Sequence, residues 1–144
     1  MSETNESIKV LSEDETWALL STASFGRVAV SIAGQPEIFP VNYVAHARSV
    51  TFRTAEGTKL FGLTANEKVA FEVDHYTATE GWSIVAKGTA HALETEAEIA
   101  EAEQLPLNSW IASVKRHYVR IDVHELSGRR FIFGDDPDPE IDAS

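Results

Sequence analysis

Residues 52–60, which read FRTAEGTKL, place two cations and two hydroxyl side chains within seven positions of one another. The cations are Arg53 and Lys59, and the hydroxyls belong to Thr54 and Thr58. The segment follows a predicted strand and opens a predicted helix. The first backbone N–H groups of a helix lack internal partners and lie at the positive end of its dipole. Together these groups are suited to bind the oxygens of a phosphate.

The same residues have a second interpretation, in which Thr54 caps the helix while Arg53 and Lys59 are simply solvated. Local spacing leaves both interpretations open. A nucleotide-binding P-loop does not fit, because residues 57–64 (GTKLFGLT) have Leu63 where that motif needs its lysine.

Charge is distributed unevenly along the 144 residues, whose net charge is −11. Segments 1–26, 92–104 and 135–142 contain 15 of the 23 acidic residues and only one of the 12 Lys and Arg. The rest of the chain has 8 acids against 11 cations, so its middle is locally positive. It has no continuous basic stripe, which disfavours nucleic-acid binding but allows a small anionic ligand.

Length and composition predict one globular domain over residues 1–134 and an acidic, disordered tail over 135–144. No stretch approaches the roughly 20 apolar residues of a membrane-spanning helix, and the first residues do not resemble a secretory signal. We therefore expect a cytoplasmic protein without a membrane partner. The absence of cysteine excludes disulfides and thiolate chemistry. The five histidines lack close ligand spacing, so no metal is expected.

Capping signals and hydrophobic periodicity predict the elements that position these groups. Capping boxes at Ser12–Glu15 and Thr95–Glu98 open helices at 12–23 and 95–105, and a third helix is predicted at 56–66. Period-two alternation predicts strands near 28–32, 38–44, 50–53, 69–73, 82–86, 118–123 and 130–133.

Pro40 should lie at a sheet edge or bulge, and Gly88 at a bulge. Residues 28/30/32, 69/71/73 and 82/84/86 should point inward. Short strands joined mostly by tight turns, with isolated helices, predict a mainly β (α+β) fold built on an antiparallel barrel.

Four stretches together resemble the pyridoxamine 5′-phosphate oxidase-like, flavin-binding split-barrel family. They are 36–44 (PEIFPVNYV), 50–60 (VTFRTAEGTKL), 82–90 (WSIVAKGTA) and 117–131 (HYVRIDVHELSGRRF). The resemblance implies an antiparallel split β-barrel of the FMN-binding type and a homodimer with a flavin at the interface. True pyridoxamine phosphate oxidases end in an Arg-Leu-His signature. The ending GRRFIFGDD lacks it, which puts that substrate in question.

The resemblance favours the phosphate interpretation of residues 52–60, since this segment grips the FMN phosphate in the family. It also places residues 40–42 along the isoalloxazine ring, where backbone groups and Asn42 can bond the polar edge. Trp82 and Trp110 are candidates for an apolar wall, supplied by the partner subunit or, alternatively, packed in the core. Arg129 and Arg130 either reach the interface or flank the last strand. The expected cofactor-binding residues are Pro40, Val41, Asn42, Arg53, Thr54, Thr58, Lys59, Trp82, Ser83 and Trp110.

The implied function is an FMN-dependent oxidoreductase that transfers hydride through flavin N5, with an unidentified small-molecule redox substrate. No side chain is identified as a general acid or base. Two alternatives stay open: a flavin-binding carrier, store or sensor without turnover, and a reductase that uses a deazaflavin. Haem ranks last, because no axial ligand is evident.

Overall fold

The computed structural model describes residues 7–54, 67–107 and 117–134. The predicted helix at 56–66, together with Thr58, Lys59 and Trp110, lies outside the described residues. Within them are seven strands and two helices. In chain order these are β1 (Ile8–Val10), α1 (Glu13–Thr22), β2 (Phe25–Ile32), β3 (Gln35–His46), β4 (Ser49–Thr54), β5 (Glu67–Tyr76), β6 (Glu80–Ala92), α2 (Glu96–Glu103) and β7 (His117–Ile132).

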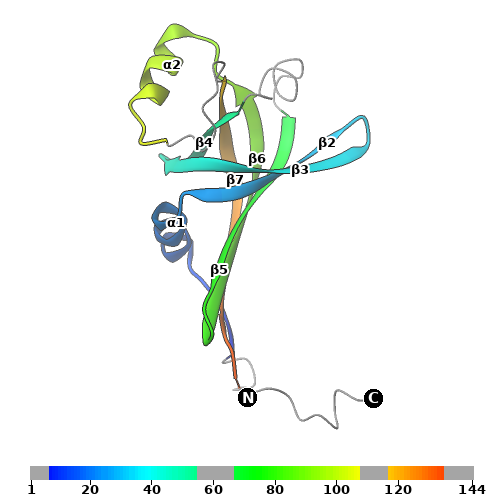
Figure 1. Cartoon of the computed structure of the whole chain (residues 1–144), viewed down its shortest axis with the longest axis vertical. Helices are drawn as coiled ribbons and strands as arrows, with labels where there is room; N and C mark the ends of the chain where they lie inside the picture. The colour runs from blue at the N-terminus through cyan, green and yellow to red at the C-terminus, as the bar shows by residue number, and fades with distance from the viewer. Residues whose placement is uncertain (1–6, 55–66, 108–116, 135–144) are drawn as a thin grey trace.

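The seven described strands form one sheet that closes on itself. Its order is β1-β7-β4-β3-β2-β5-β6, and β6 also pairs with β7, so six strands make a ring (Figure 1). All of the pairings are antiparallel. The short β1 pairs with the end of β7, beyond the part of β7 that pairs with β4. This arrangement confirms the predicted mainly antiparallel fold.

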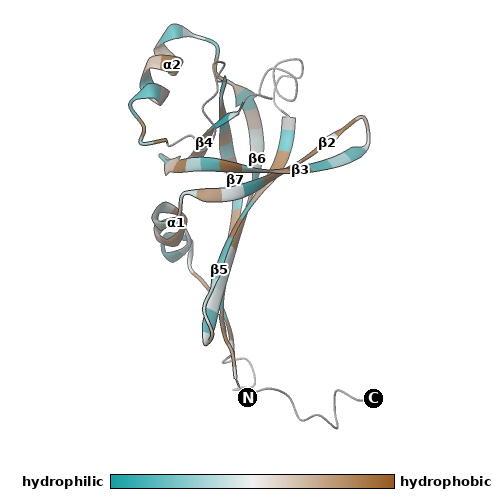
Figure 2. Ribbon diagram, viewed as in Figure 1, coloured by the Kyte–Doolittle hydropathy of each residue, from teal (hydrophilic) through white to brown (hydrophobic). Residues whose placement is uncertain are grey.

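The ring encloses the core, as the alternation of apolar and polar residues along its strands requires (Figure 2). The predicted inward positions 69/71/73 are all buried. The main core residues are Leu20, Val28, Val30, Val41, Tyr43, Val50, Phe52, Val69, Phe71, Val73, Ile84, Ala86, Ala90, Val119, Ile121 and Val123.

Two residues predicted to point inward are less buried than expected. Ile32 is 38% exposed, because β2 pairs with β5 only over residues 27–29 and its end projects beyond the ring as a hairpin with β3. Ala33 and Gly34 make the tight turn of that hairpin, both with positive φ. Trp82 is half-buried, although it packs against the core cluster.

Both described helices begin at the predicted capping boxes and are one or two residues shorter than expected at each end. The Glu15 N–H donates to Ser12 Oγ (3.1 Å), and the Ser12 N–H donates to Glu15 Oε1 (2.9 Å). The bond from the Ser12 N–H, followed by one from the Ser12 hydroxyl, lowers the pKa of the Glu15 carboxyl. Helix α1 is fixed to the ring by the buried Tyr43 hydroxyl, which donates to the Leu20 carbonyl at 2.6 Å. Neither described helix has the length and apolar character that a bilayer crossing needs.

The last two predicted strands, 118–123 and 130–133, are one continuous strand, β7. Strand β6 offers it an unbroken antiparallel partner from Ala92 opposite Val119 to Glu80 opposite Ile132. The register shifts between Lys87 and Gly88, where His124 of β7 is the extra residue, so the predicted bulge lies at Gly88 with its extra residue on the partner strand. The polar stretch at 124–129 therefore belongs to the sheet. Its alternation is weak because Gly128 stands at an inward position where an apolar side chain would be expected.

Gly88 is required by the close approach of β7 at this bulge. A Cβ at Gly88 would overlap the backbone carbonyl of Asp122. We expect Gly88→Ala to lower the free energy of unfolding by about 3 kcal/mol, at the upper end of overpacking costs, because backbone rather than a flexible side chain must move. Urea unfolding measures this. Gly134→Ala is the control, since a Cβ there meets nothing within 4 Å; equal effects of the two changes would contradict the prediction.

Candidate functional site

Strands β3 and β4 separate at the residues that the family resemblance predicts to bind the cofactor. Among the described residues, their ladder ends at Tyr43 opposite Phe52. Beyond it, β3 continues with β2 alone, with Asn42 opposite Phe25. Strand β4 continues with β7, with Arg53 opposite Tyr118. The next residues of the two strands thus flank a gap in the ring.

The β3 side of this gap carries Pro40, Val41 and Asn42. Pro40 pairs with Arg27 of β2 and lies outside the β3–β4 ladder, so its predicted edge position is confirmed. The side chain of Val41 is 5% exposed and belongs to the core, and its backbone pairs with Gly26 of β2 rather than facing the gap. Asn42 is half-buried and lies on the opposite face of the strand from Val41.

The β4 side carries Arg53 and Thr54, both half-buried. Arg53 Nη2 donates to the Leu107 carbonyl at 3.1 Å, and the guanidinium carbon lies 6.0 Å from the centre of the Tyr118 ring. No carboxylate of the described residues lies within ion-pair distance of Arg53. A guanidinium has five N–H donors, so a positioned cation with spare donors stands beside the gap.

Trp82 and Ser83 lie far from this gap in the same chain. Trp82 of β6 pairs with Arg130 of β7, whereas Arg53 pairs with Tyr118, twelve residues earlier on β7. At about 3.3 Å per residue, the two positions are separated by roughly 40 Å of strand. Figure 1 shows β4 in the upper half of the view and the β5–β6 hairpin, where β6 begins, in the lower half. One chain therefore brings residues 40–42 and 53–54 together, but not Trp82 and Ser83.

Ser83 lines a cavity of about 280 Å³ on the outer face of β6 and β7. Its other lining residues include Lys87, Ser127 and Arg129. Neither Lys87 nor Arg129 forms an ion pair in the part of the chain that the structure describes. Lys87 and Ser127 are not among the residues predicted from the sequence. Lys87 lies four residues from Ser83, and Ser127 lies two residues from Arg129. Side chains an even number of residues apart share one face of a strand, and this spacing is the signal that could have found them.

An acidic pair adjoins Ser83 on the same outer face. Asp74 is opposite Ser83, and Glu72 is opposite Val85. Arg27 Nη1 lies 2.9 Å from Glu72 Oε1 and 3.9 Å from Asp74 Oδ1. Burial, followed by the hydrogen bond and charge of Asp74, raises the pKa of Glu72 to about 6, against the opposing effect of Arg27.

The raised pKa of Glu72 predicts a pH-dependent contribution to stability. The folded chain binds this proton more tightly than the unfolded chain, whose carboxyl titrates near 4.5. The contribution is therefore full below about pH 4.5 and is lost as the pH rises through about 6. We expect Glu72→Gln to remove this fall from the unfolding free energy measured in urea between pH 4.5 and 7. Identical pH profiles for the wild type and the variant would contradict the assignment. Ser127→Ala, on the same face, should keep the wild-type profile.

The described residues contain no group of three His, Asp or Glu side chains arranged to hold a metal ion. The family model described as pyridoxamine 5′-phosphate oxidase matches residues 12–130. The chain belongs to this family. The match includes both sides of the gap between β3 and β4 and the start of β6.

Three relatives illustrate the family around this chain. A Corynebacterium glutamicum structure described as a candidate pyridoxamine 5′-phosphate oxidase has 38% identity and a TM-score of 0.85, and covers 91% of this chain and 98% of its own. The FAD-binding protein from Mycobacterium smegmatis has 42% identity and a TM-score of 0.76, covering 88% and 100%. An uncharacterised Mycobacterium tuberculosis protein is 47% identical over 95 residues, 66% of this chain and 86% of that protein.

Proposed function

We propose that this protein is a flavin-dependent oxidoreductase that holds FMN by its phosphate at the gap between β3 and β4. The observation that carries the proposal is Arg53, a half-buried cation positioned by Leu107 and Tyr118 beside the gap. A phosphate accepts charge-assisted bonds from such a guanidinium. Family membership and the FAD-binding relative from M. smegmatis support a flavin as the ligand.

The residues on the two sides of the gap fit two parts of a flavin. Arg53 and Thr54 offer donors to the phosphate, and Thr58 and Lys59 follow on the same segment. The β3 segment offers the Pro40 carbonyl, the backbone of Asn42 and the Asn42 side-chain amide along the ring, while Val41 anchors the segment to β2. A bound flavin supplies hydride-transfer chemistry, while the protein binds and orients it.

A second copy of the chain completes the proposed site. Trp82 and Ser83 lie too far from Arg53 to touch the same flavin within one chain. They lie near the end of the molecule that also exposes apolar side chains, including Val10 (74%), Tyr76 (75%) and Ile132 (57%). Exposed apolar clusters of this kind are typical of protein interfaces. We therefore propose a homodimer in which each flavin contacts Arg53 of one chain and Trp82 of the other.

FAD is the second candidate cofactor, because it is the ligand named for the 42% identical relative. FAD and FMN share the phosphate next to the ribityl chain, so the role proposed for Arg53 applies to both. Mass spectrometry of the small molecule released from the purified protein distinguishes FMN, FAD and a deazaflavin. Oxidation of reduced nicotinamide by the flavin-loaded protein distinguishes an oxidoreductase from a carrier or sensor, which would show none.

The phosphate role of Arg53 predicts a selective loss of affinity. Arg53→Ala removes a charge-assisted bond of about 1.5–3 kcal/mol and should weaken FMN binding about ten- to a hundredfold. Riboflavin, which lacks the phosphate, should bind weakly to the wild type and almost equally weakly to the variant. Quenching of flavin fluorescence measures both. Lys59→Ala should behave in the same way.

Arg48→Ala is the matched control for Arg53→Ala. It also removes one arginine charge near β4, but Arg48 pairs with Glu13 and stacks over Trp17, away from the gap. It should leave FMN affinity within about twofold of the wild type, since long-range charge effects are screened by salt. If Arg53→Ala weakened riboflavin and FMN binding by the same factor, Arg53 would support the fold rather than hold the phosphate.

The two-chain site predicts complementation between defective variants. Chains with Arg53→Ala and chains with Trp82→Ala, carrying different affinity tags, are coexpressed and the mixed dimer is purified. One site of that dimer carries both changes and the other carries neither. We therefore expect the mixed dimer to bind one flavin with wild-type affinity, while each parent dimer binds weakly. A mixed dimer as weak as its parents would show that each site is built within one chain. Thermal unfolding of Trp82→Ala checks that it remains folded.

A further inference from the structure

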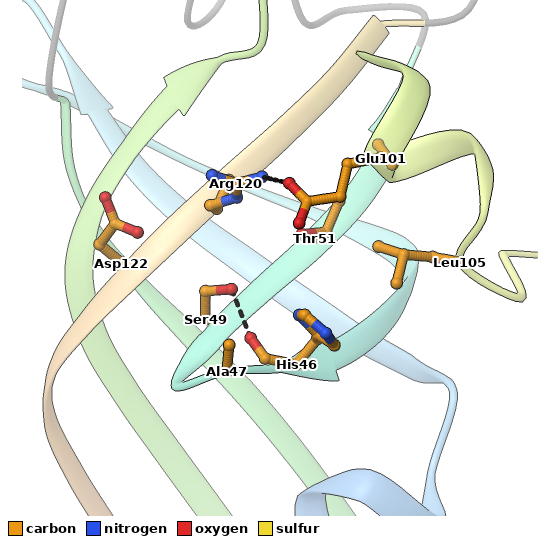
Figure 3. A pocket seen from close by; sticks show the side chains of 9 residues that line it. His46, Ala47, Ser49, Thr51, Glu101, Leu105, Arg120 and Asp122 are labelled. Carbon is orange, nitrogen blue, oxygen red and sulfur yellow. Dashed lines mark hydrogen bonds and ion pairs between the residues drawn. The ribbon is translucent and has the colours of Figure 1, made fainter. Parts of the chain in front are cut away.

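A separate cavity lies under α2, against the outer face of β4 and β7 (Figure 3). Its volume is about 150 Å³, enough for a small molecule of a few heavy atoms. The polar side chains that matter most are Ser49 and Thr51 of β4, Arg120 and Asp122 of β7, and Glu101 of α2. The proposed flavin site uses none of these residues.

Thr51 is the first sign that the cavity receives a ligand. Its side chain is only 2% exposed and lines the cavity. A hydroxyl in the wall of a cavity can donate to a ligand carboxylate, whereas a valine of the same shape cannot. Ser49, also buried, donates to the His46 carbonyl at 2.6 Å, which leaves its oxygen as an acceptor.

Arg120 supplies a positive charge beside Thr51, its partner across the β4–β7 ladder. The arginine side chain is 24% exposed, and Arg120 Nη2 lies 3.5 Å from Glu101 Oε1. That separation is longer than the roughly 2.7–2.9 Å of a charge-assisted hydrogen bond. Glu101 is 65% exposed, so the pair is weak and a competing carboxylate can replace it.

Carboxylates lie toward the solvent side of the same cavity. Asp122 is 53% exposed, and Figure 3 shows Arg120 between the carboxylates of Asp122 and Glu101. His91 Nδ1 is 3.8 Å from Asp122 Oδ2, beyond hydrogen-bond distance. The cavity thus presents donors at the half-buried Arg120 and the buried Thr51, and carboxylate acceptors nearer solvent.

We propose that this cavity binds a small zwitterion of amino-acid size. Its carboxylate accepts from Arg120 and from the Thr51 hydroxyl, and its ammonium group donates to Asp122. A simple anion would satisfy Arg120 but would lie against two carboxylates, and a simple cation would lie against the guanidinium. A molecule with both charges matches the two sets, and the cavity volume limits it to a small side chain.

Calorimetric titration of the full-length protein tests the proposal with glycine, L-alanine, acetate and methylamine. We expect glycine or alanine to bind at least about tenfold more tightly than acetate or methylamine, because each of the latter loses one charge-assisted contact. Thr51→Val should weaken amino-acid binding by about tenfold.

Thr89→Val is the matched control. Thr89 is another strand threonine, and its hydroxyl lies 3.1 Å from His124 Nε2, outside this cavity. Amino-acid binding should survive this change. Absence of binding by either amino acid, acetate or methylamine binding as tightly as glycine, or unchanged affinity in Thr51→Val would each overturn the proposal. Arg120→Gln, which should abolish binding, provides a second independent variant.

Discussion

The ladder between β6 and β7 is the interaction on which the arrangement of the molecule depends. It runs from Glu80 opposite Ile132 to Ala92 opposite Val119 and turns an open sheet into a ring. Closure removes the free edges that a six-stranded sheet would otherwise expose. Because β7 is so long, its start also holds β4 and its end holds β1. The two ends of one strand thus set the separation between Arg53 and Trp82.

A closed ring can tolerate one local gap, and this one lies between β3 and β4. Residues beyond Tyr43 and Phe52 keep a ladder on their other sides, with β2 and β7 respectively, so they stay ordered without pairing to each other. Backbone groups at such a gap are available to a ligand in a way that ladder residues are not. The charge distribution suits an anion there, since most acids lie in the terminal segments and in α2.

The sequence predicts strands and helices well where a simple periodicity marks them. Val69, Phe71 and Val73 alternate cleanly, and Ser12 and Thr95 open recognisable capping boxes, so these elements are found at nearly their correct limits. The sequence does not predict β1, because its three residues are all exposed and show no alternation of apolar and polar side chains. The sequence does not predict that β7 is one continuous strand. Its middle has polar outward side chains and Gly128 on the inward face, a pattern typical of a loop.

The site is only partly readable from sequence for a related reason. Residue type and spacing predict a phosphate-binding role for Arg53 and Thr54, since these lie close together in the chain. The periodicity of a single strand does not reveal the order of the strands in the sheet. The distance between Arg53 and Trp82 is therefore known only from the structure, in which they pair with opposite ends of β7. The cavity beside Thr51 is hidden for the same reason: Thr51 looks like an ordinary outward residue until Arg120 and Glu101 are placed next to it.

The separation of Arg53 from Trp82 has an energetic consequence. The end of the molecule formed by β1, the β5–β6 hairpin and the end of β7 exposes Ile8, Val10, Tyr76 and Ile132, and this apolar surface lacks a cover within the described chain. If a second copy covers it, the same association completes the flavin site. Cofactor binding and dimerisation then stabilise each other, because each favours the state that the other requires. Added flavin should therefore shift the chain toward the dimer, and dilution should release flavin.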